Sequence, residues 1–368
     1  MNKDIVSHLR DIIFFRDTLC SISHVDEVEI MKIWARWIIT HRSLFPQHTI
    51  CLPEDHEYDP QLLVELIEKG VSTLHSNFLH DWMIKETQLI NRRFPWRYGE
   101  LEYGGLHGNV PVTMSDSVED GQVVLTCDDL ETVLPVTVFS KLLKRAKENE
   151  ATRLKPLNYI WFIGLLYSLL DGKGLQWAVP SSVMYILRNR LNCDTELFAS
   201  PINQFFARYY SLFPYDIALG SRGNFFTAPD SDFISGCFQV NPPFIDCLFT
   251  KTTTRILNLL KIADDNEQDL TFVYIMPCWE RFTTYEMVTE SPYCVKQINL
   301  KANGHFYYQH ITNTYIRARF GTCVIFLSTN PMCCDAKTEM DIIGAFSRST
   351  PTYYAASNRG KKMILLQY

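Results

Sequence analysis

Four consecutive residues, Asn241-Pro242-Pro243-Phe244, form the part of the sequence best suited to chemistry. They follow the apolar run 236–240, which is typical of a buried strand. Two successive prolines cannot continue a sheet, and each restricts the residue before it, so the strand must end in a rigid corner. At the carboxyl ends of strands in an open α/β sheet, such a corner faces the ligand crevice.

The residue types in this corner suit methyl transfer to the exocyclic amine of adenine. That amine is a weak nucleophile, and the side-chain oxygen of Asn241 and the main-chain carbonyl of Pro242 can each accept one of its N–H groups. Its lone pair would then point at an electrophilic methyl group, so catalysis would consist of positioning and electrostatics. Phe244 can stack on an adenine that has left its own stack. An ordinary turn that happens to read N-P-P-F is the alternative.

Two further stretches could hold a methyl donor. Residues 196–203 are expected to form a short strand and a polar turn before a helix over 203–212, where Ser200 and Asn203 could bind a carboxylate. Residues 216–223 are expected to form a second strand and a glycine loop, with Asp216 near ribose hydroxyls. Ordinary turns between strands and helices would also explain both stretches.

The rest of the chain predicts the elements that position these residues. Residues 1–90 carry apolar stripes at helical spacing, and two strands are expected at 110–114 and 123–127. We then expect helices over 136–147, 159–170, 181–191, 203–212 and 245–262, and strands over 196–198, 216–219, 236–240, 271–276, 295–300 and 322–327. Strands alternating with helices predict an α/β sandwich with a largely parallel sheet. We place a domain change near residue 150, between a mainly helical domain (1–150) and an α/β domain (151–368).

Composition limits the class of protein. The net charge of −6, from 35 basic and 41 acidic residues, excludes a protein coated in positive charge but allows a local basic groove. The 11 cysteines show no C-x-x-C spacing, so we expect no metal site, and unpaired thiols in a reducing compartment. The sequence shows neither the apolar core of a signal peptide nor a membrane span, which predicts a soluble intracellular protein, nuclear or cytoplasmic.

Several motifs occur in a specific order along the second half of the chain. They are FASPIN at 198–203, LFP at 212–214, GSRG at 220–223, GCFQVNPPF at 236–244, IMPCW at 275–279 and TYIRARFGTCVIFL at 314–327. Together they resemble the phosphorylated-CTD-interacting-factor family of cap-specific adenosine N6-methyltransferases. The resemblance implies a Rossmann-like, S-adenosylmethionine-dependent methyltransferase domain beside a mainly helical N-terminal domain. It also implies N6-methylation of the adenosine next to the 7-methylguanosine cap of mRNA.

The resemblance also implies roles for individual residues. The catalytic residues would be Asn241, Pro242, Pro243 and Phe244, and the cofactor contacts would be Phe198, Ser200, Pro201, Asn203, Asp216, Gly220, Ser221 and Asn241. Three features depart from the family. Trp34 and Trp37 do not have the spacing of a WW module, so no WW-mediated binding of polymerase tails is expected. Cys278 stands where the family typically has an acid, and nothing is carried over for residues 331–368.

A capped RNA 5′ end would bring phosphates and a cationic guanine to the protein. Arginines interleaved with aromatics suit such a ligand, because they combine phosphate pairing with stacking. The candidate RNA contacts are Arg92, Arg93, Trp96 and Arg97, and also Arg317 and Arg319. The basic face at 141–147 is a further candidate. Helix-capping arginines and solvated basic faces are the alternatives.

Two other functions stay open on the sequence alone. One is an N6-adenine methyltransferase that acts on DNA or internal RNA, which would share the Asn241–Phe244 chemistry. The other is a catalytically silent RNA-binding subunit.

Overall fold

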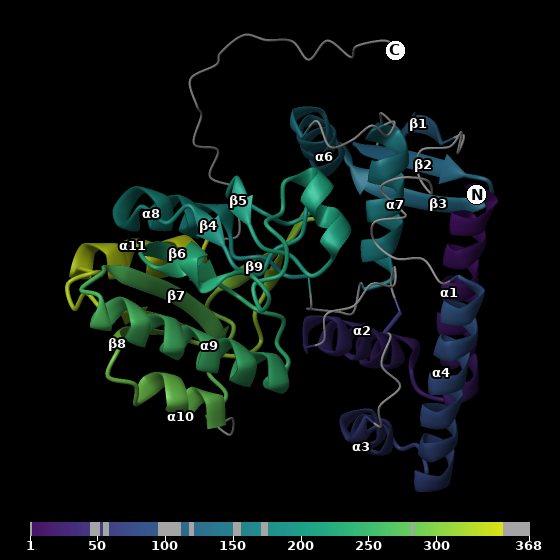
Figure 1. The fold of residues 1–368 in the computed structure, drawn as a ribbon, viewed down its shortest axis with the longest axis horizontal. Coiled ribbons are helices and arrows are strands. Elements are labelled where there is room, and N and C mark those ends of the chain that lie inside the picture. The colour runs from purple at the N-terminus through teal and green to yellow at the C-terminus, as the bar shows by residue number, and fades with distance from the viewer. Residues whose placement is uncertain are drawn as a thin grey trace.

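The structure is a computed structural model that describes residues 2–44, 52–53, 59–94, 112–117, 121–149, 156–170, 176–280 and 283–348. Figure 1 shows an α/β sandwich beside a mainly helical part that carries a small sheet. The α-helices are α1 (Asn2–Ser23), α2 (Glu27–Leu44), α3 (Pro60–Glu68), α4 (Thr73–Arg93), α6 (Val136–Glu148), α7 (Pro156–Ser168), α8 (Ser181–Leu191), α9 (Asp246–Asp265), α10 (Thr283–Thr289) and α11 (Ala336–Phe346).

The strands form three sheets. They are β1 (Thr113–Ser117), β2 (Gln122–Cys127), β3 (Leu130–Pro135), β4 (Thr195–Glu196), β5 (Arg208–Tyr209), β6 (Gly236–Val240), β7 (Leu270–Pro277), β8 (Cys294–Leu300), β9 (Phe306–Gln309), β10 (Thr314–Arg317) and β11 (Thr322–Ser328). β1, β2 and β3 make an antiparallel sheet, and β9 pairs with β10. The main sheet has the order β5-β4-β6-β7-β11-β8.

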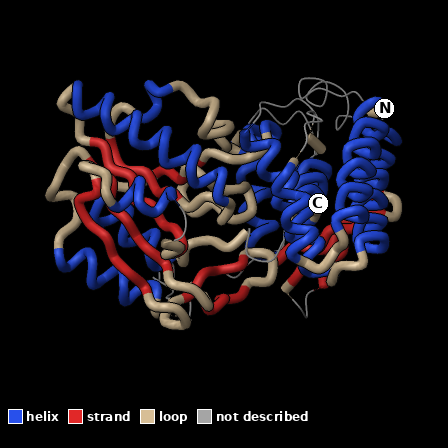
Figure 2. The backbone as a smooth tube through the Cα atoms, turned by 90° about the horizontal axis from the view of Figure 1, so that it is seen from below, coloured by secondary structure: helices blue, strands red, loops and turns tan. Residues whose placement is uncertain are grey.

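The main sheet is largely parallel, as the sequence predicts. β5, β4, β6 and β7 pair in parallel, while β11 runs antiparallel to both of its neighbours. Helices α8 and α11 cover one face and helices α9 and α10 cover the other (Figures 1 and 2). The described part of the chain therefore holds a three-layer α/β sandwich.

Strand β7 shows why this sheet has two covered faces. All eight of its residues are buried, so both faces of the strand need an apolar partner. Phe272, Tyr274 and Met276 pack in one apolar cluster with α9, while Val273 and Ile275 pack in another with α8 and α11. This period-2 division of side chains is what a pleated strand imposes.

The N-terminal half is helical, as its apolar stripes predict, and β3 is an additional strand that the sequence analysis missed. Helix α7 packs against α6 and β3, and Asn158 to Tyr167 are all buried along its length. The Trp34 indole N–H in α2 donates to the Leu169 carbonyl after α7, at 3.0 Å. One apolar cluster therefore includes residues from both sides of position 150. Among the described helices, none is long and apolar enough to cross a membrane.

Two expected elements are wrong. No helix forms over 203–212; the chain makes a turn there and then the short strand β5. The strand expected at 216–219 is instead part of a 3₁₀ helix, η2 (Pro214–Leu219), and a second 3₁₀ helix, η3 (Asp230–Phe233), precedes β6. Pro214 explains why η2 forms in place of the expected strand. Its fixed φ suits the first turn of a helix, and it lacks the N–H that a strand would use for pairing.

Asp216 lies inside η2 with its side chain fully buried. The Tyr167 hydroxyl donates to its carboxyl oxygen at 2.6 Å. Burial raises the pKa of Asp216 to about 7, and it outweighs the hydrogen bond from Tyr167, which lowers the pKa. Between about pH 4 and pH 7, the folded protein therefore retains a proton on this carboxyl group that the unfolded chain releases.

Gly164 in α7 gives a first test of the packing between α7 and β3. A Cβ at this position would lie 2.7 Å from Thr132 Oγ1, so Gly164→Ala should lower the free energy of unfolding by about 1–3 kcal/mol. Gly344→Ala in α11 is the matched control, because nothing lies within 4 Å of its Cβ. The control should gain about 0.5–1 kcal/mol through helix propensity. Urea unfolding measures both, and a stable Gly164→Ala variant would contradict the close approach.

Asp216 gives a second test, through pH. Because the pKa is raised from 3.8 in the unfolded chain to about 7 in the fold, unfolding releases a proton within that window. The contribution of Asp216 to the free energy of unfolding should therefore decline as pH rises from about 4 to 7, whereas His8 and His310, whose pKa values burial lowers, contribute in the opposite direction. Asp216→Asn should flatten this decline, while Asn at the exposed Asp269 should not. Urea unfolding at several pH values measures the slope; equal slopes for wild type and Asp216→Asn would contradict this account.

Candidate active site

The parallel pairing of β4 with β6 brings the two chemistry-bearing stretches together. Thr195 pairs with Phe238 and Glu196 with Gln239, so the loops that leave the two strands emerge at the same edge of the sheet. The strands that follow β4 in the chain, β5 and β6, lie on opposite sides of it. Such a reversal of strand order opens a crevice outside the carboxyl ends. A cavity occupies this position, and residues from both loops line it.

Asn241 is the best-defined polar group in this cavity. Its side-chain N–H donates to the Trp177 carbonyl at 3.5 Å, which fixes the orientation of the amide. Its Oδ1 atom is buried and has no hydrogen-bond partner among the described residues. A buried acceptor without a donor is costly, so its presence in a cavity indicates a ligand that supplies an N–H or O–H group.

The next three residues form the rigid corner that the sequence predicts. Pro242 is buried, and the Ile245 N–H donates to the Pro243 carbonyl at 2.7 Å before α9 begins. The Phe244 ring is partly buried and packs near Phe249 of α9, with 5.9 Å between ring centroids and 28° between planes. Both prolines and Phe244 line the cavity with Asn241.

The loop after β4 closes on itself. Asn203 Oδ1 accepts hydrogen bonds from the Ser200 N–H at 2.7 Å and from the Ser200 hydroxyl at 3.0 Å. Ser200 Oγ in turn accepts from the Asn203 N–H at 3.2 Å. The loop therefore keeps a fixed shape without the helix that the sequence analysis expected after it.

Lys141 and Glu196 brace the same loop from either side. The Lys141 ammonium donates to the carbonyls of Ile202 and Gln204, at 2.6 and 3.1 Å. Glu196 Oε1 accepts from the N–H groups of Phe205 and Phe206, at 2.6 and 2.7 Å. Burial raises the pKa of Glu196 to about 7 and lowers the pKa of Lys141 to about 8. Lys141 is thus engaged inside the protein, and it does not belong to a solvated basic face.

The structure divides the expected cofactor contacts into two groups. Phe198, Ser200, Asn203 and Asn241 line the cavity. Pro201, Asp216, Gly220 and Ser221 are not among its lining residues. Ser221 lies behind the lining, since its hydroxyl is 2.6 Å from that of the cavity residue Ser211. Asp216 accepts a hydrogen bond from the cavity residue Tyr167 and is fully buried, so its carboxyl group does not reach the cavity as the predicted ribose contact requires.

Other cavity residues were missed by the sequence analysis. They are Ile39, Tyr167, Gln176, Trp177, Ala178, Val179, Glu196, Leu197, Ala199, Ser211, Leu212, Asn224, Phe225, Phe226 and Gln239. Gln239 could have been found, because it lies in β6 two residues before Asn241, and alternate residues of an extended segment point to the same side. Ile39 and Tyr167 carry no such signal, since the tertiary packing of α2 and α7 brings them to the cavity.

The expected RNA contacts are dispersed in the structure. Arg92 and Arg93 end α4 and are not among the residues that line the cavity, and the Arg93 guanidinium pairs with Asp11 at 2.6 Å. Trp96 and Arg97 lie outside the described residues. Arg317 packs over the Phe306 ring at 5.3 Å, and Arg319 is exposed.

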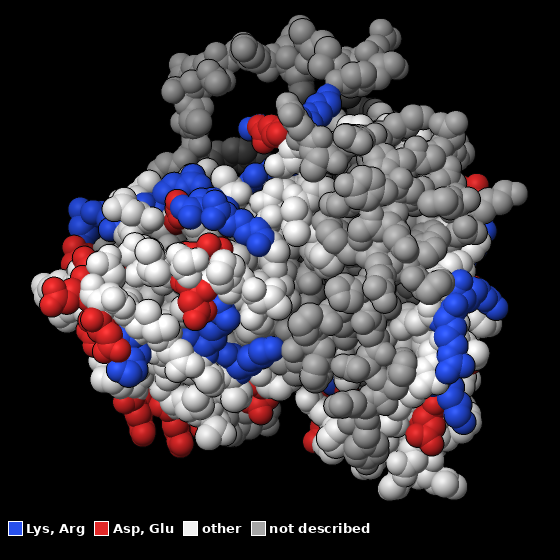
Figure 3. Space-filling view, viewed as in Figure 1, with Lys and Arg blue, Asp and Glu red and all other residues white. Residues whose placement is uncertain are grey.

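Basic side chains also gather over α8 on the face shown in Figure 3. Two of these arginines already form ion pairs. Arg190 of α8 pairs with Asp341, and Arg208 of β5 pairs with Asp194. This surface is therefore less positively charged in effect than its residue types indicate.

The expectation of unpaired thiols is wrong for two cysteines. A disulfide joins Cys278, directly after β7, to Cys323 in β11. Eight other cysteines in the described part of the chain are free. No group of three or more metal-ligating side chains occurs among the described residues.

A segment that includes the cavity loops is similar to a known protein family. The family described as "Phosphorylated CTD interacting factor 1 WW domain" matches residues 137–310. Although that description names a WW domain, the matched residues here form helices α6 to α10 and strands β4 to β9, including the cavity loops.

Two curated relatives are similar to part of the chain. The mRNA (2′-O-methyladenosine-N(6)-)-methyltransferases of Homo sapiens and Mus musculus are each 33% identical to this chain over 174 residues. The alignment covers 44% of this chain and 24% of each relative, so the chain spans about a quarter of their length. Residues 137–310 are therefore similar to the phosphorylated CTD interacting factor family, and part of the chain is similar to these two methyltransferases.

Proposed function

We propose that this protein is an S-adenosylmethionine-dependent RNA methyltransferase that modifies N6 of the adenosine next to the 7-methylguanosine cap. The observation that carries the proposal is the buried, unpartnered Oδ1 of Asn241 in the cavity. We take the substrate class, an adenosine of mRNA, from the names of the human and mouse relatives.

The sheet supports a Rossmann-like methyltransferase domain. Helices cover both faces of a largely parallel sheet, and the cavity lies where the strand order reverses. This is the position at which open α/β sheets bind their cofactors and substrates.

The cavity residues fit a donor that has a polar amino-acid end and a planar base. Ser200, Asn203 and Ser211 offer polar groups, while Phe198 and Phe226 offer aromatic surface, with 5.7 Å between their ring centroids. When bound, S-adenosylmethionine supplies an electrophilic methyl group. A donor carboxylate would lie near the Ser200–Asn203 turn, and an adenine near the phenylalanines.

The protein residues position the substrate amine. Asn241 Oδ1 and the Pro242 carbonyl each accept one N–H of the adenine amine, which turns its lone pair away from the ring and toward the donor side of the cavity. Phe244 stacks on the adenine and holds it out of its own stack. The amine proton leaves to water after the attack, so no side chain in the cavity has to act as a base.

Asn241→Ala tests the mechanism directly. It removes one of the two acceptors and should lower kcat at least about 100-fold, the usual loss when one positioned group is deleted from an electrostatic site. Asn241→Asp keeps an oxygen acceptor and should retain more activity than the alanine variant. Transfer of labelled methyl to capped, adenosine-initiated RNA measures both.

Asn258→Ala, at an exposed position of α9, is the matched control and should behave as wild type. Uncapped RNA and DNA of the same sequence serve as further substrates. Wild-type turnover by Asn241→Ala would exclude the mechanism, and equal transfer to capped RNA and DNA would exclude cap specificity.

Asn203→Ala tests the donor site. The substitution removes the oxygen that accepts two hydrogen bonds from Ser200, so the turn should open. We expect the Kd for S-adenosylhomocysteine to rise about tenfold, the value of one or two hydrogen bonds. Titration calorimetry measures it, with Asn258→Ala as the control. An unchanged Kd would place the donor elsewhere.

A further inference from the structure

A group of aromatic rings lies beside Phe244, which lines the cavity together with Trp177. The ring centroids of Trp279 and Phe320 lie 6.1 and 5.7 Å from that of Phe244. Trp177, whose carbonyl holds the Asn241 amide, lies 6.5 Å from Phe320, and their planes differ by only 10°. The three rings come from segments about 40 or more residues apart in sequence, and the sheet brings them together.

Trp177 and Phe320 differ from the Phe244 ring in orientation. The plane of Phe320 is turned 81° from that of Phe244. A base that stacks on Phe244 therefore cannot also stack on Phe320. The nearly parallel rings of Trp177 and Phe320 present a second direction of stacking next to the first.

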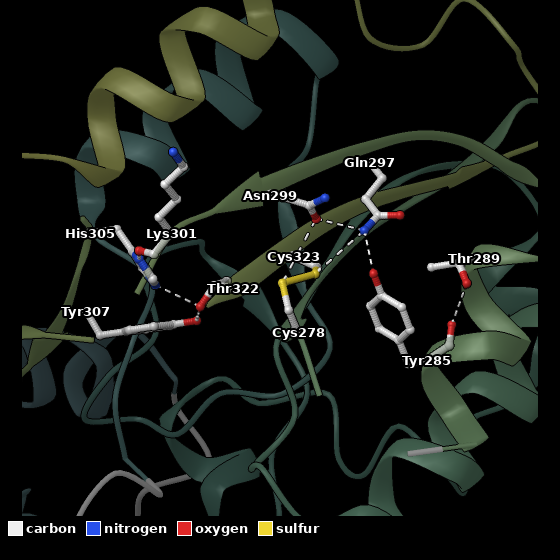
Figure 4. The surroundings of a disulfide bond; sticks show 10 residues. All are labelled: Cys278, Tyr285, Thr289, Gln297, Asn299, Lys301, His305, Tyr307, Thr322 and Cys323. Carbon is white, nitrogen blue, oxygen red and sulfur yellow. Dashed lines mark hydrogen bonds between the residues drawn. A yellow bond between two sulfur atoms is a disulfide. The ribbon is translucent and has the colours of Figure 1, made fainter. Parts of the chain in front are cut away.

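The surrounding structure fixes these rings, as Figure 4 shows for part of it. Thr322 Oγ1 lies 3.0 Å from the Tyr307 hydroxyl and 2.8 Å from His305 Nε2, so the buried Tyr307 is held against β11. The Tyr307 ring packs against both Phe320 and Trp177, with 6.1 Å between ring centroids in each pair. The Cys278–Cys323 disulfide secures the residue that precedes Trp279.

The three rings are only partly buried, although apolar side chains of this size usually enter the core. Arg319, directly before Phe320, is exposed and makes no hydrogen bond or ion pair with any other described residue. Partly exposed aromatic faces with an adjacent unpaired cation are what a nucleotide needs, one for its base and the other for its phosphate.

We propose that Trp177, Trp279 and Phe320 form a second nucleobase site, which binds the nucleotide joined by phosphate to the target adenosine. Arg319 pairs with the phosphate between the two. The proposal rests on the proposed function, because it takes the Asn241–Phe244 corner as the site of the target base. The occupant is a planar base, which either the guanine on the 5′ side of the adenosine or the nucleotide on its 3′ side can supply.

Phe320→Ala tests the site on three substrates that share a 5′-terminal adenosine. They are a capped oligonucleotide, the same oligonucleotide with a 5′ triphosphate, and the capped dinucleotide without a 3′ neighbour. Loss of one stacked base should raise KM about tenfold with little change in kcat, and Phe320→Tyr should restore KM. Phe78→Ala is the control, because Phe78 is a 54% exposed aromatic on the surface of α4.

The pattern of loss identifies the base. A rise in KM for both capped substrates alone assigns the site to the 5′ guanine, and a rise for both oligonucleotides alone assigns it to the 3′ nucleotide. An unchanged KM for all three, an equal rise for all three, or a weaker Kd for S-adenosylhomocysteine would overturn the proposal. If wild type methylates none of the substrates, the proposed function fails. Fluorescence anisotropy of labelled RNA, in which Phe320→Ala must bind more weakly, then tests the site alone.

Arg319→Gln tests the phosphate contact. It should reduce the slope of log Kd against log salt concentration by about 0.7, the value of one phosphate contact on a single strand. Lys261→Gln, at the far end of α9, removes the same charge and should leave the slope unchanged. An unaltered slope for Arg319→Gln would exclude this residue from the site.

Discussion

The parallel hydrogen bonding between β4 and β6 is the constraint on which the candidate site depends. The pairing extends over only the two residues of β4. It nevertheless sets the relative position of the loops after β4 and β6, which contain the site residues. A slip of one residue would turn the Asn241 side chain to the other face of the sheet, away from the Ser200–Asn203 turn. The contacts that hold these loops are therefore as important for the site as the β4–β6 pairing itself. Lys141 and Glu196 hold the loop after β4, and the double proline holds the loop after β6.

The site also depends on polar groups that the protein leaves without protein partners. Most buried polar atoms here are paired, as the bonds of Glu196 to two N–H groups illustrate. Asn241 Oδ1 and the guanidinium of Arg319 differ, the first inside the cavity and the second at the surface near Phe320. Burial shields Asn241 Oδ1 from water, whereas the Arg319 guanidinium contacts solvent and is accessible to a ligand. In the proposed roles, Asn241 binds the amine of the target adenine and Arg319 binds the phosphate that joins this nucleotide to its neighbour.

The sequence predicted well wherever local pattern and tertiary structure agree. Helix α8 has the expected bounds of 181–191, and β6 has those of 236–240, because an apolar pattern is clear in both. The prediction failed between 203 and 219. There β5 is too short to show alternation, and a turn closed by side chains replaces the expected helix. The Asn241–Phe244 corner was predictable, since its two prolines act locally.

Contacts between distant segments could not be predicted. Nothing in the run 91–98 indicates that Arg93 pairs with Asp11, a pairing that the packing of α4 on α1 produces. The convergence of Trp177, Trp279 and Phe320 likewise follows from sheet order, which one sequence does not encode in any local pattern. The disulfide between Cys278 and Cys323 belongs to the same class of feature.

Helix α7 has a practical consequence for how this protein can be divided in the laboratory. Because its middle ten residues are buried on every side, no cut beside it leaves a polar surface. A fragment that begins near residue 150 would keep α7 but lose β3, α6 and Trp34, and would expose apolar side chains of α7 that these elements cover. Truncation there would remove the partners of a buried helix as well as the N-terminal half, so point substitution separates the roles of the two halves more cleanly.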